Sequence, residues 1–332
     1  MGDIAYADAW LKEEKAGYIT PLNKTDNGAV YDRILNEFYD EVEELSSETP
    51  YMVSPGQYFD TIIIALPSDI MFQATTRPTA TMAATLPSAC RARRISPVTA
   101  LTGSKKYRSP PLRTCILTVN SMPSAQSGGV ENFWYSWDHG MVHYIQYNTE
   151  TDFPNAPDLP GGSGSENAGP FAPTGAQLAW LKRDLASVNR EKTPWVIAAG
   201  HRPWYMSSQP GCTDCQAAFE PLFLKYGVDL VLSGHVHFYD RQAAVDNGTT
   251  QEITNNPTAP WYITNGAGGH YDGLDTPDAT LAPTSRKVIV DYGWSLFTVH
   301  NCTHLTTEFI SSGNGSVLDT ATLVKKRECC LE

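Results

Sequence analysis

The sequence has no long hydrophobic run and carries little positive charge. Its most apolar stretch, residues 62–66, is far shorter than the roughly 20 residues that a membrane-spanning helix needs. Lys and Arg number 24 against 36 Asp and Glu, which gives a formal net charge of −12 at pH 7. Because nucleic-acid binding relies on basic surfaces, we expect neither a membrane span nor a nucleic-acid partner.

A secretory signal is also not visible at the start of the sequence. Four acceptor triplets for N-glycosylation nevertheless occur, at Asn23, Asn247, Asn301 and Asn314. Lysine is scarce, whereas asparagine, threonine and glycine are frequent. These features together indicate a secreted, extracellular parent protein.

Cysteine is limited to seven residues, so at least one stays unpaired within the chain. Cys212 and Cys215 have the spacing of half a zinc ribbon, but no second Cys-x-x-Cys follows. The pattern therefore favours a small-loop disulfide or two free thiols over structural zinc.

The segment 57–122 differs from the rest of the chain. It is rich in Thr, Ala, Pro and Arg and has no sustained hydrophobic period, so we expect irregular structure. Two origins fit this composition: a disordered surface insertion, or translation of out-of-frame or intronic sequence. The second is favoured because well-patterned sequence resumes abruptly afterwards. Before this segment, the pattern predicts a helix over 29–45 and a short buried strand over 50–56.

After residue 129 the pattern alternates between strands and helices. Strands are predicted at 133–137, 141–147, 195–199 and 228–232, and helices at 178–188, with Thr174 as cap, and at 217–226. Residues 258–325 are β-rich, with a glycine loop at 266–269 where backbones pass closely. This order predicts a layered α/β fold, in which ligands collect at the carboxyl ends of strands.

Two Gly-His turns stand at such strand ends. One contains His201, and the other contains His235 and His237. Imidazole is a suitable ligand for transition metals, and in an extended turn two residues that are two positions apart point to similar sides. We therefore interpret these three histidines as metal ligands. The other histidines are interpreted as packing or surface residues, with His270 as the one minority candidate.

The motifs together resemble the purple acid phosphatases of fungi and plants, which are calcineurin-like metallophosphoesterases. The resemblance covers the whole chain except 57–122. Its motifs lie at 2–8 (Gly-Asp-x-x-Tyr-Ala-Asp), 132–152, 201–205 (His-Arg-Pro-Trp-Tyr), 234–241 (Gly-His-Val-His-x-Tyr-Asp-Arg) and 265–270 (Asn-Gly-Ala-Gly-Gly-His). A Gly-His-x-His turn with a distant Gly-Asp-x-x-Tyr is specific as a set.

This resemblance implies a layered αββα metallophosphoesterase sandwich with two metals. Asp3 would bridge the metals, and Tyr6 would bind Fe(III) as tyrosinate together with His237. His201 and His235 would hold a divalent metal, which is zinc, manganese or iron. The implied reaction is that of an acid phosphatase, in which metal-bound hydroxide attacks a small phosphate monoester.

The same resemblance sets the expected domain organisation. We expect residues 1–257 to form the catalytic domain and residues 258–325 to form the C-terminal β-rich part of the same purple acid phosphatase domain.

The sequence departs from the family pattern at two metal motifs. No Asp-x-Gly motif with its strand precedes Gly2, and Gln57 and Tyr58 stand where Asn and His belong. We therefore expect a truncated or misassembled product that lacks N-terminal strands. Two alternatives to an active phosphatase follow: a catalytically impaired fragment that binds metal weakly, and a metal-dependent phosphodiesterase or nucleotide pyrophosphatase. Tyr6 argues against the second alternative, because tyrosinate ligation is the purple phosphatase signature.

Overall fold

The computed structural model describes residues 51–52, 64–65, 122–159, 162, 169–208, 210–252, 254–269 and 273–328. Strands β1 (Tyr51–Met52) and β2 (Ile64–Ala65) pair antiparallel. Strand β1 confirms part of the strand predicted over 50–56, and β2 is an exception to the irregular structure predicted over 57–122. The helix predicted over 29–45 lies outside the described residues.

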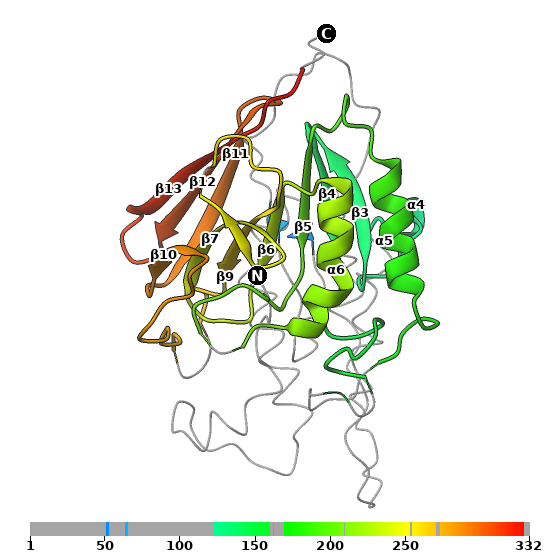
Figure 1. Cartoon of the computed structure of the whole chain (residues 1–332), viewed down its shortest axis with the longest axis horizontal. Helices are drawn as coiled ribbons and strands as arrows, with labels where there is room; N and C mark the ends of the chain where they lie inside the picture. The colour runs from blue at the N-terminus through cyan, green and yellow to red at the C-terminus, as the bar shows by residue number, and fades with distance from the viewer. Residues whose placement is uncertain are drawn as a thin grey trace, which may run out of the picture.

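Eight strands form one large sheet (Figure 1). They are β3 (Tyr135–His139), β4 (Val142–Gln146), β5 (Trp195–Ala199), β6 (Leu230–Ser233), β7 (Tyr239–Asp246), β8 (Thr249–Gln251), β9 (Trp261–Asn265) and β10 (Ser285–Ile289). Their order is β10-β7-β9-β6-β5-β4-β3, and β8 pairs with β7. Strands β4, β5, β6 and β9 run parallel, so their carboxyl ends, with both Gly-His turns, share one edge of the sheet.

Helices α5 (Ala176–Ser187) and α6 (Thr213–Tyr226) cover one face of this sheet, and the short helix α4 (Ser124–Ser127) contacts β3 (Figure 1). Side chains alternate across a strand, so every second residue of β5 faces the helices. Val196 and Ala198 are these residues, and they share one buried cluster with Trp180, Phe219 and Phe223 from the helices.

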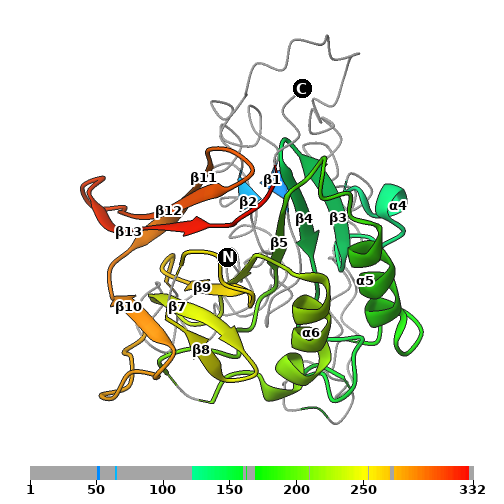
Figure 2. The same cartoon turned by 45° about the horizontal axis from the view of Figure 1, so that its top comes forward.

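The opposite face packs on a second, antiparallel sheet of β11 (Gly293–Val299), β12 (His304–Ser311) and β13 (Val317–Val324) (Figure 2). Trp195 and Ile197 of β5 join Leu305 and Phe309 of β12 in one buried cluster. The described layers are therefore helix, sheet and sheet, which confirms the predicted layered α/β fold. The N-terminal part of the predicted αββα sandwich lies outside the described residues.

Both long helices begin at residues other than those predicted. Gly175 precedes α5 with φ 78° and no side-chain cap bond, so the prediction of Thr174 as cap is wrong. Helix α6 begins at Thr213 because Cys212 caps it: the Cys212 Sγ accepts the Cys215 N–H at 3.2 Å. The same two cysteines form a disulfide, which decides between the two interpretations drawn from the sequence.

Strand β7 was not predicted, and its polar side chains join the two sheets. The Tyr239 hydroxyl donates to Asp319 Oδ2 at 3.0 Å, and Arg241 donates to both Asp319 oxygens at 2.6 and 3.0 Å. Asp319 belongs to β13 of the second sheet. Burial would raise the Asp319 pKa, but the Arg241 guanidinium outweighs burial and holds the pKa below its usual value.

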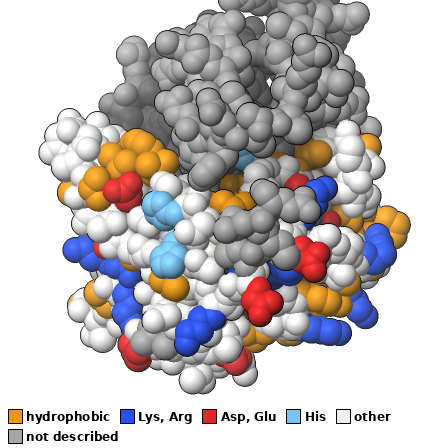
Figure 3. Space-filling model, turned by 90° about the horizontal axis from the view of Figure 1, so that it is seen from above, with side chains coloured by type: hydrophobic (Ala, Val, Ile, Leu, Met, Phe, Trp, Pro, Cys, Tyr) orange, Lys and Arg blue, Asp and Glu red, His pale blue; other side chains and the backbone are white. Residues whose placement is uncertain are grey.

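The surface carries charges of both signs. On the face seen from above, Lys and Arg side chains are interspersed with Asp and Glu over the described residues, with no continuous basic field among them (Figure 3). No helix within the described ranges is long and apolar enough to cross a membrane. A mixed-charge face of this kind is typical of a solvated surface.

Candidate metal centre

The two Gly-His turns meet at the carboxyl ends of β5 and β6. His201 follows β5 and is fully buried, whereas His235 follows β6 and is partly exposed. His235 Nδ1 lies 3.0 Å from His201 Nε2, and the ring planes cross at 74° with centroids 4.9 Å apart. The Gly234 N–H donates to His201 O at 2.9 Å and joins the turns. One nitrogen of each ring therefore faces the same small volume.

The spacing of the two nitrogens fits a shared metal ion. Two imidazole nitrogens bound at about 2.0–2.1 Å, with an angle between about 90° and 109° at the metal, lie about 2.9–3.4 Å apart. The observed 3.0 Å falls in that range. Burial lowers the pKa of His201 well below its usual value, and the charges of Arg202 and His237 lower it further. The His201 ring is therefore neutral at neutral pH, which is the form that binds metals.

The turn after β6 is coiled rather than extended. His235 has φ 66°, a left-handed value that is uncommon for a residue with a side chain. The Val236 N–H donates to Gly234 O at 2.7 Å, and the Phe238 N–H donates to Val236 O at 2.9 Å. The extended turn that the sequence predicted is therefore not formed, and His235 and His237 face different partners.

His237 faces Asp275, which lies far along the chain. The His237 N–H donates to Asp275 Oδ2 at 2.8 Å, and the Asp275 N–H donates to His237 O at 3.2 Å. The His237 Nδ1 lies 3.8 Å from the same carboxylate oxygen. Asp275 therefore fixes the backbone of His237 and places a carboxylate beside its ring.

Two glycines allow the turns to pack closely on their neighbours. A Cβ at Gly200 would lie 2.5 Å from the ring of Tyr147. A Cβ at Gly266 would lie 2.2 Å from Val236 O, inside the second turn. The close backbone approach predicted for the glycine loop at 266–269 is confirmed at this position.

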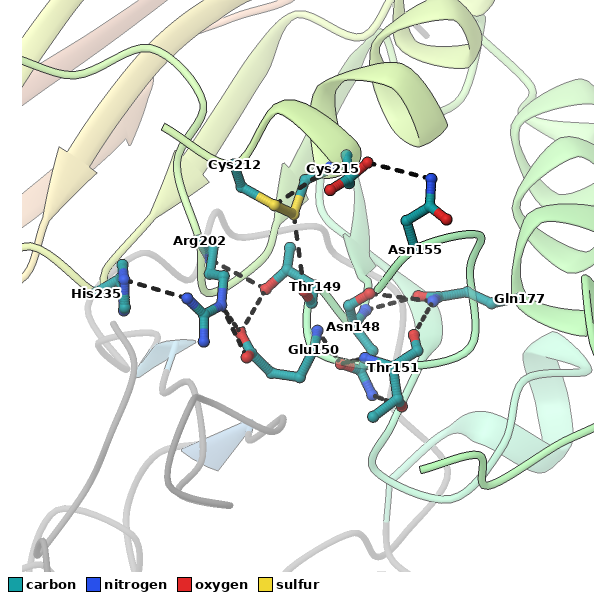
Figure 4. The surroundings of a disulfide bond; sticks show 11 residues. Asn148, Thr149, Glu150, Thr151, Asn155, Gln177, Arg202, Cys212, Cys215 and His235 are labelled. Carbon is teal, nitrogen blue, oxygen red and sulfur yellow. Dashed lines mark hydrogen bonds and ion pairs between the residues drawn. A yellow bond between two sulfur atoms is a disulfide. The ribbon is translucent and has the colours of Figure 1, made fainter. Parts of the chain in front are cut away.

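A buried polar loop lies behind His235 (Figure 4). Residues 148–152 follow β4, and all of them are buried. The Arg202 N–H donates to Thr149 Oγ1 at 3.0 Å, and Arg202 Nε donates to the two Glu150 carboxylate oxygens at 2.9 and 2.8 Å. Arg202 Nη1 lies 3.5 Å from His235 Nε2. A charge-neutral ion pair therefore adjoins the outer side of the His235 ring.

The remaining candidate ligands Asp3, Tyr6 and His270 lie outside the described residues, as do Gln57 and Tyr58, which replace the family's ligands. Within the described ranges, no cluster of three or more His, Cys, Asp or Glu could hold a metal by itself. The structure thus brings His201 and His235 together and leaves His237 beside them, next to Asp275.

Sequence reasoning missed the supporting residues Glu150, Arg202 and Asp275. Two of them had a local signal: Arg202 adjoins His201, and Glu150 lies in a polar run directly after a predicted strand. Asp275 had none, because it contacts His237 across a long intervening segment.

Proteins similar in sequence to this chain are acid phosphatases. The family model "Calcineurin-like phosphoesterase" matches residues 99–239, and the model "Iron/zinc purple acid phosphatase-like protein C" matches residues 259–320. Acid phosphatase A from Cryphonectria parasitica is 35% identical over 329 residues, which cover 98% of this chain. The chain belongs to the purple acid phosphatase family. Membership in this family implies a dinuclear metal centre.

The purple acid phosphatase relatives are longer than this chain. The alignment covers 61% of the Cryphonectria protein. An acid phosphatase from Aspergillus ficuum is 37% identical over 241 residues, covering 61% of this chain and 39% of that protein. A solved purple acid phosphatase from yellow lupin seeds is 27% identical, with a TM-score of 0.46, covering 59% of this chain and 33% of that one. The chain thus spans less than two thirds of these relatives.

Proposed function

We propose that this chain carries the metal centre of an acid phosphatase that hydrolyses small phosphate monoesters. The observation that carries the proposal is the 3.0 Å approach of His201 Nε2 and His235 Nδ1 at neighbouring strand ends. Asp3, Tyr6 and His237 complete the proposed ligand set, as family membership implies. When bound, Fe(III) and a divalent zinc, manganese or iron ion would supply Lewis acidity and a water of lowered pKa.

The described residues contribute binding and orientation. His201 presents a neutral, buried nitrogen from a rigid strand end, and His235 presents one from a coiled turn. Gly200 and Gly266 let these turns sit close to their neighbours. In-line attack at phosphorus requires rigid placement, because a small misplacement of the reacting groups lowers the reaction rate strongly.

A second candidate function is a metal-binding chain with little turnover. Gln57 and Tyr58 stand where the family has an amide and an imidazole ligand, and loss of a ligand commonly costs about 10–100-fold in metal affinity or activity. We therefore propose weak turnover for this chain. The third candidate, a phosphodiesterase or nucleotide pyrophosphatase, is opposed by Tyr6.

The test measures bound metal together with hydrolysis of a generic phosphate monoester and a diester. We expect His201→Ala and His235→Ala each to reduce divalent metal, whereas His304→Ala, at the exposed start of β12, leaves it unchanged. Tyr6→Phe should abolish a broad visible absorption band. Full metal content in both histidine variants would refute the assignment of His201 and His235 as ligands. A colourless protein with full iron content would refute the assignment of Tyr6.

We further propose that the parent protein is a secreted glycoprotein that acts on small substrates without nucleic-acid or membrane partners. Asn247, Asn301 and Asn314 all lie in exposed turns. At Asn301 the Oδ1 accepts hydrogen bonds from Thr303 N and Oγ1, both at 2.8 Å, so the amide oxygen is occupied within its own triplet. The fourth triplet, at Asn23, lies outside the described residues. Loss of mass on enzymatic deglycosylation of secreted protein would support this proposal, and unchanged mass would refute it.

A further inference from the structure

We propose that two different carboxylates support the two metal positions from outside the ligand set. Glu150, acting through Arg202, is the positioning residue for the His201–His235 pair, and Asp275 is the positioning residue for His237. This inference rests on the proposed metal centre, and it assigns roles to residues that are themselves not ligands.

The support behind His235 is a buried ion pair. Glu150 is 2% exposed, and its carboxylate accepts both hydrogen bonds from Arg202 Nε at 2.8 and 2.9 Å. The close-up shows the Arg202 side chain lying between Glu150 and His235 (Figure 4). Because Arg202 cannot lose its charge, Glu150 is the group that neutralises it. Without that carboxylate, the positive charge of Arg202 would not be neutralised. Arg202 would then repel the metal cation that His235 binds in the proposed centre, because like charges repel.

The pair also fixes the backbone that carries His201. Arg202 is the next residue, and its N–H donates to Thr149 Oγ1 at 3.0 Å. The Thr149 hydroxyl in turn donates to Glu150 Oε1 at 3.1 Å. One carboxylate thus orders the side chain beside His235 and the main chain after His201.

The support of His237 is independent of that pair. The Asp275 carboxylate accepts the His237 N–H at 2.8 Å, the Asp275 N–H donates to His237 O at 3.2 Å, and Asp275 Oδ2 lies 3.8 Å from the ring Nδ1. A carboxylate on the Nδ1 side leaves Nε2 as the nitrogen that faces a metal, and such outer carboxylates orient ligating histidines. His235, by contrast, turns Nδ1 towards His201. The two metal positions therefore have separate outer supports.

The experiment crosses two single variants. Glu150→Gln should weaken divalent-metal binding about 10–100-fold while iron content and the visible band stay unchanged. Asp275→Asn should do the reverse, lowering iron content and shifting or bleaching the band while divalent affinity holds. Glu191→Gln and Asp278→Asn, both exposed, serve as controls. Metal content, chelator competition and circular dichroism are measured on the full chain.

A rescue variant separates positioning from folding. Glu150→Gln with Arg202→Gln removes the carboxylate and the cation together, so divalent affinity should recover at least partly relative to Glu150→Gln alone. Parallel loss of both metals in the two single variants, or no recovery in the double variant, would overturn the inference. If the inference fails in this way but wild-type protein binds both metals, the proposed function is not refuted. Wild-type protein without metal would overturn the proposed function and this inference together.

Discussion

At the scale of single residues, Gly200 occupies a position in the His201 turn that has no room for a side chain. Its missing side chain makes room for Tyr147, a fully buried ring between the turn and the helix layer. The neighbouring His201 depends on that fit, because the backbone of residue 200 cannot move without moving this proposed ligand. A steric change at residue 200 should therefore be felt in both stability and metal binding.

We expect Gly200→Ala to lower the free energy of unfolding by about 1–3 kcal/mol, the usual cost of overpacking a buried site. The new Cβ would lie 2.5 Å from the Tyr147 ring, so one of them must shift. Gly268→Ala is the matched control, because nothing lies within 4 Å of a Cβ there. Urea denaturation of both variants tests this, and equal midpoints would contradict the steric reading.

The strand-end placement of His201 and His235, the proposed ligands, was predictable from sequence, but the contact of Asp275 with His237 was not. His201 and His235 follow buried apolar strands with a glycine before each, a local pattern that marks a strand end. The Asp275 carboxylate accepts a hydrogen bond from the backbone N–H of His237, which lies 38 positions earlier. Because the contact between His237 and Asp275 depends on tertiary structure, no local sequence pattern predicts it.

At the scale of elements, His143 joins strands β3 and β4 to helix α5. Its Nδ1 lies 2.7 Å from Asp138 Oδ1 and its Nε2 lies 3.0 Å from Asp184 Oδ2. Ser136 donates to the other Asp184 oxygen at 2.5 Å. Burial would lower the pKa of His143, but Asp184 and Asp138 outweigh burial and raise it. When it is protonated, the imidazole between two carboxylates thus fastens the helix to the sheet edge.

This network should make the α5 edge most stable in acid. A histidine whose pKa is raised on folding contributes its full stability below the unfolded value near 6.5 and loses it as pH rises through the folded value. We expect the free energy of unfolding of wild-type protein, relative to His143→Gln, to fall as pH rises above about 6.5. His139→Gln, at the exposed end of β3, is the control. A wild-type-minus-variant difference that is flat with pH would refute the charged network.

The sequence predicts the bounds of an apolar strand better than the start of a helix. The strand at 195–199 was predicted with correct bounds, because its run is apolar throughout. The start of α6 was placed too late, since Thr213 to Gln216 carry no apolar stripe and the cap is a cysteine. Disulfide-bonded Cys212 supplies the accepting atom there, which propensity alone does not indicate.

At the scale of the whole molecule, Asp319 holds the two sheets together. Its carboxylate accepts from Tyr239 and Arg241 of β7 while its own strand, β13, belongs to the other sheet. Strand β7 could not be predicted from its own sequence. Its polar residues are buried because residues from elements distant in the chain form hydrogen bonds with them. Asp240, for example, is fully buried and accepts hydrogen bonds from Ser207 and Ser285.

We expect Asp319→Ala to cost about 3–5 kcal/mol, because it leaves Arg241 buried without its carboxylate. The lowered pKa of Asp319 means that its contribution is present above the unfolded value near 3.8 and is lost only as pH falls through the lower folded value. The wild-type pairing therefore persists in mild acid. Glu191→Ala, which removes an exposed carboxylate, should change the midpoint little. Denaturation at pH 5 and pH 7 measures both variants, and similar losses in the two would refute the cross-sheet role.

The place of β9 in the large sheet has a consequence for biosynthesis. Strands β6 and β7 are consecutive in the chain, yet β9 lies between them, and the turn with His235 and His237 crosses its end. While the polypeptide leaves the ribosome, β6 can dock on β5, but its other edge stays open until residues 261–265 have emerged. An open strand edge is a site for wrong pairing, so the nascent chain needs protection late in translation. The histidine turn, although made earlier, acquires its final shape only after that strand has been inserted.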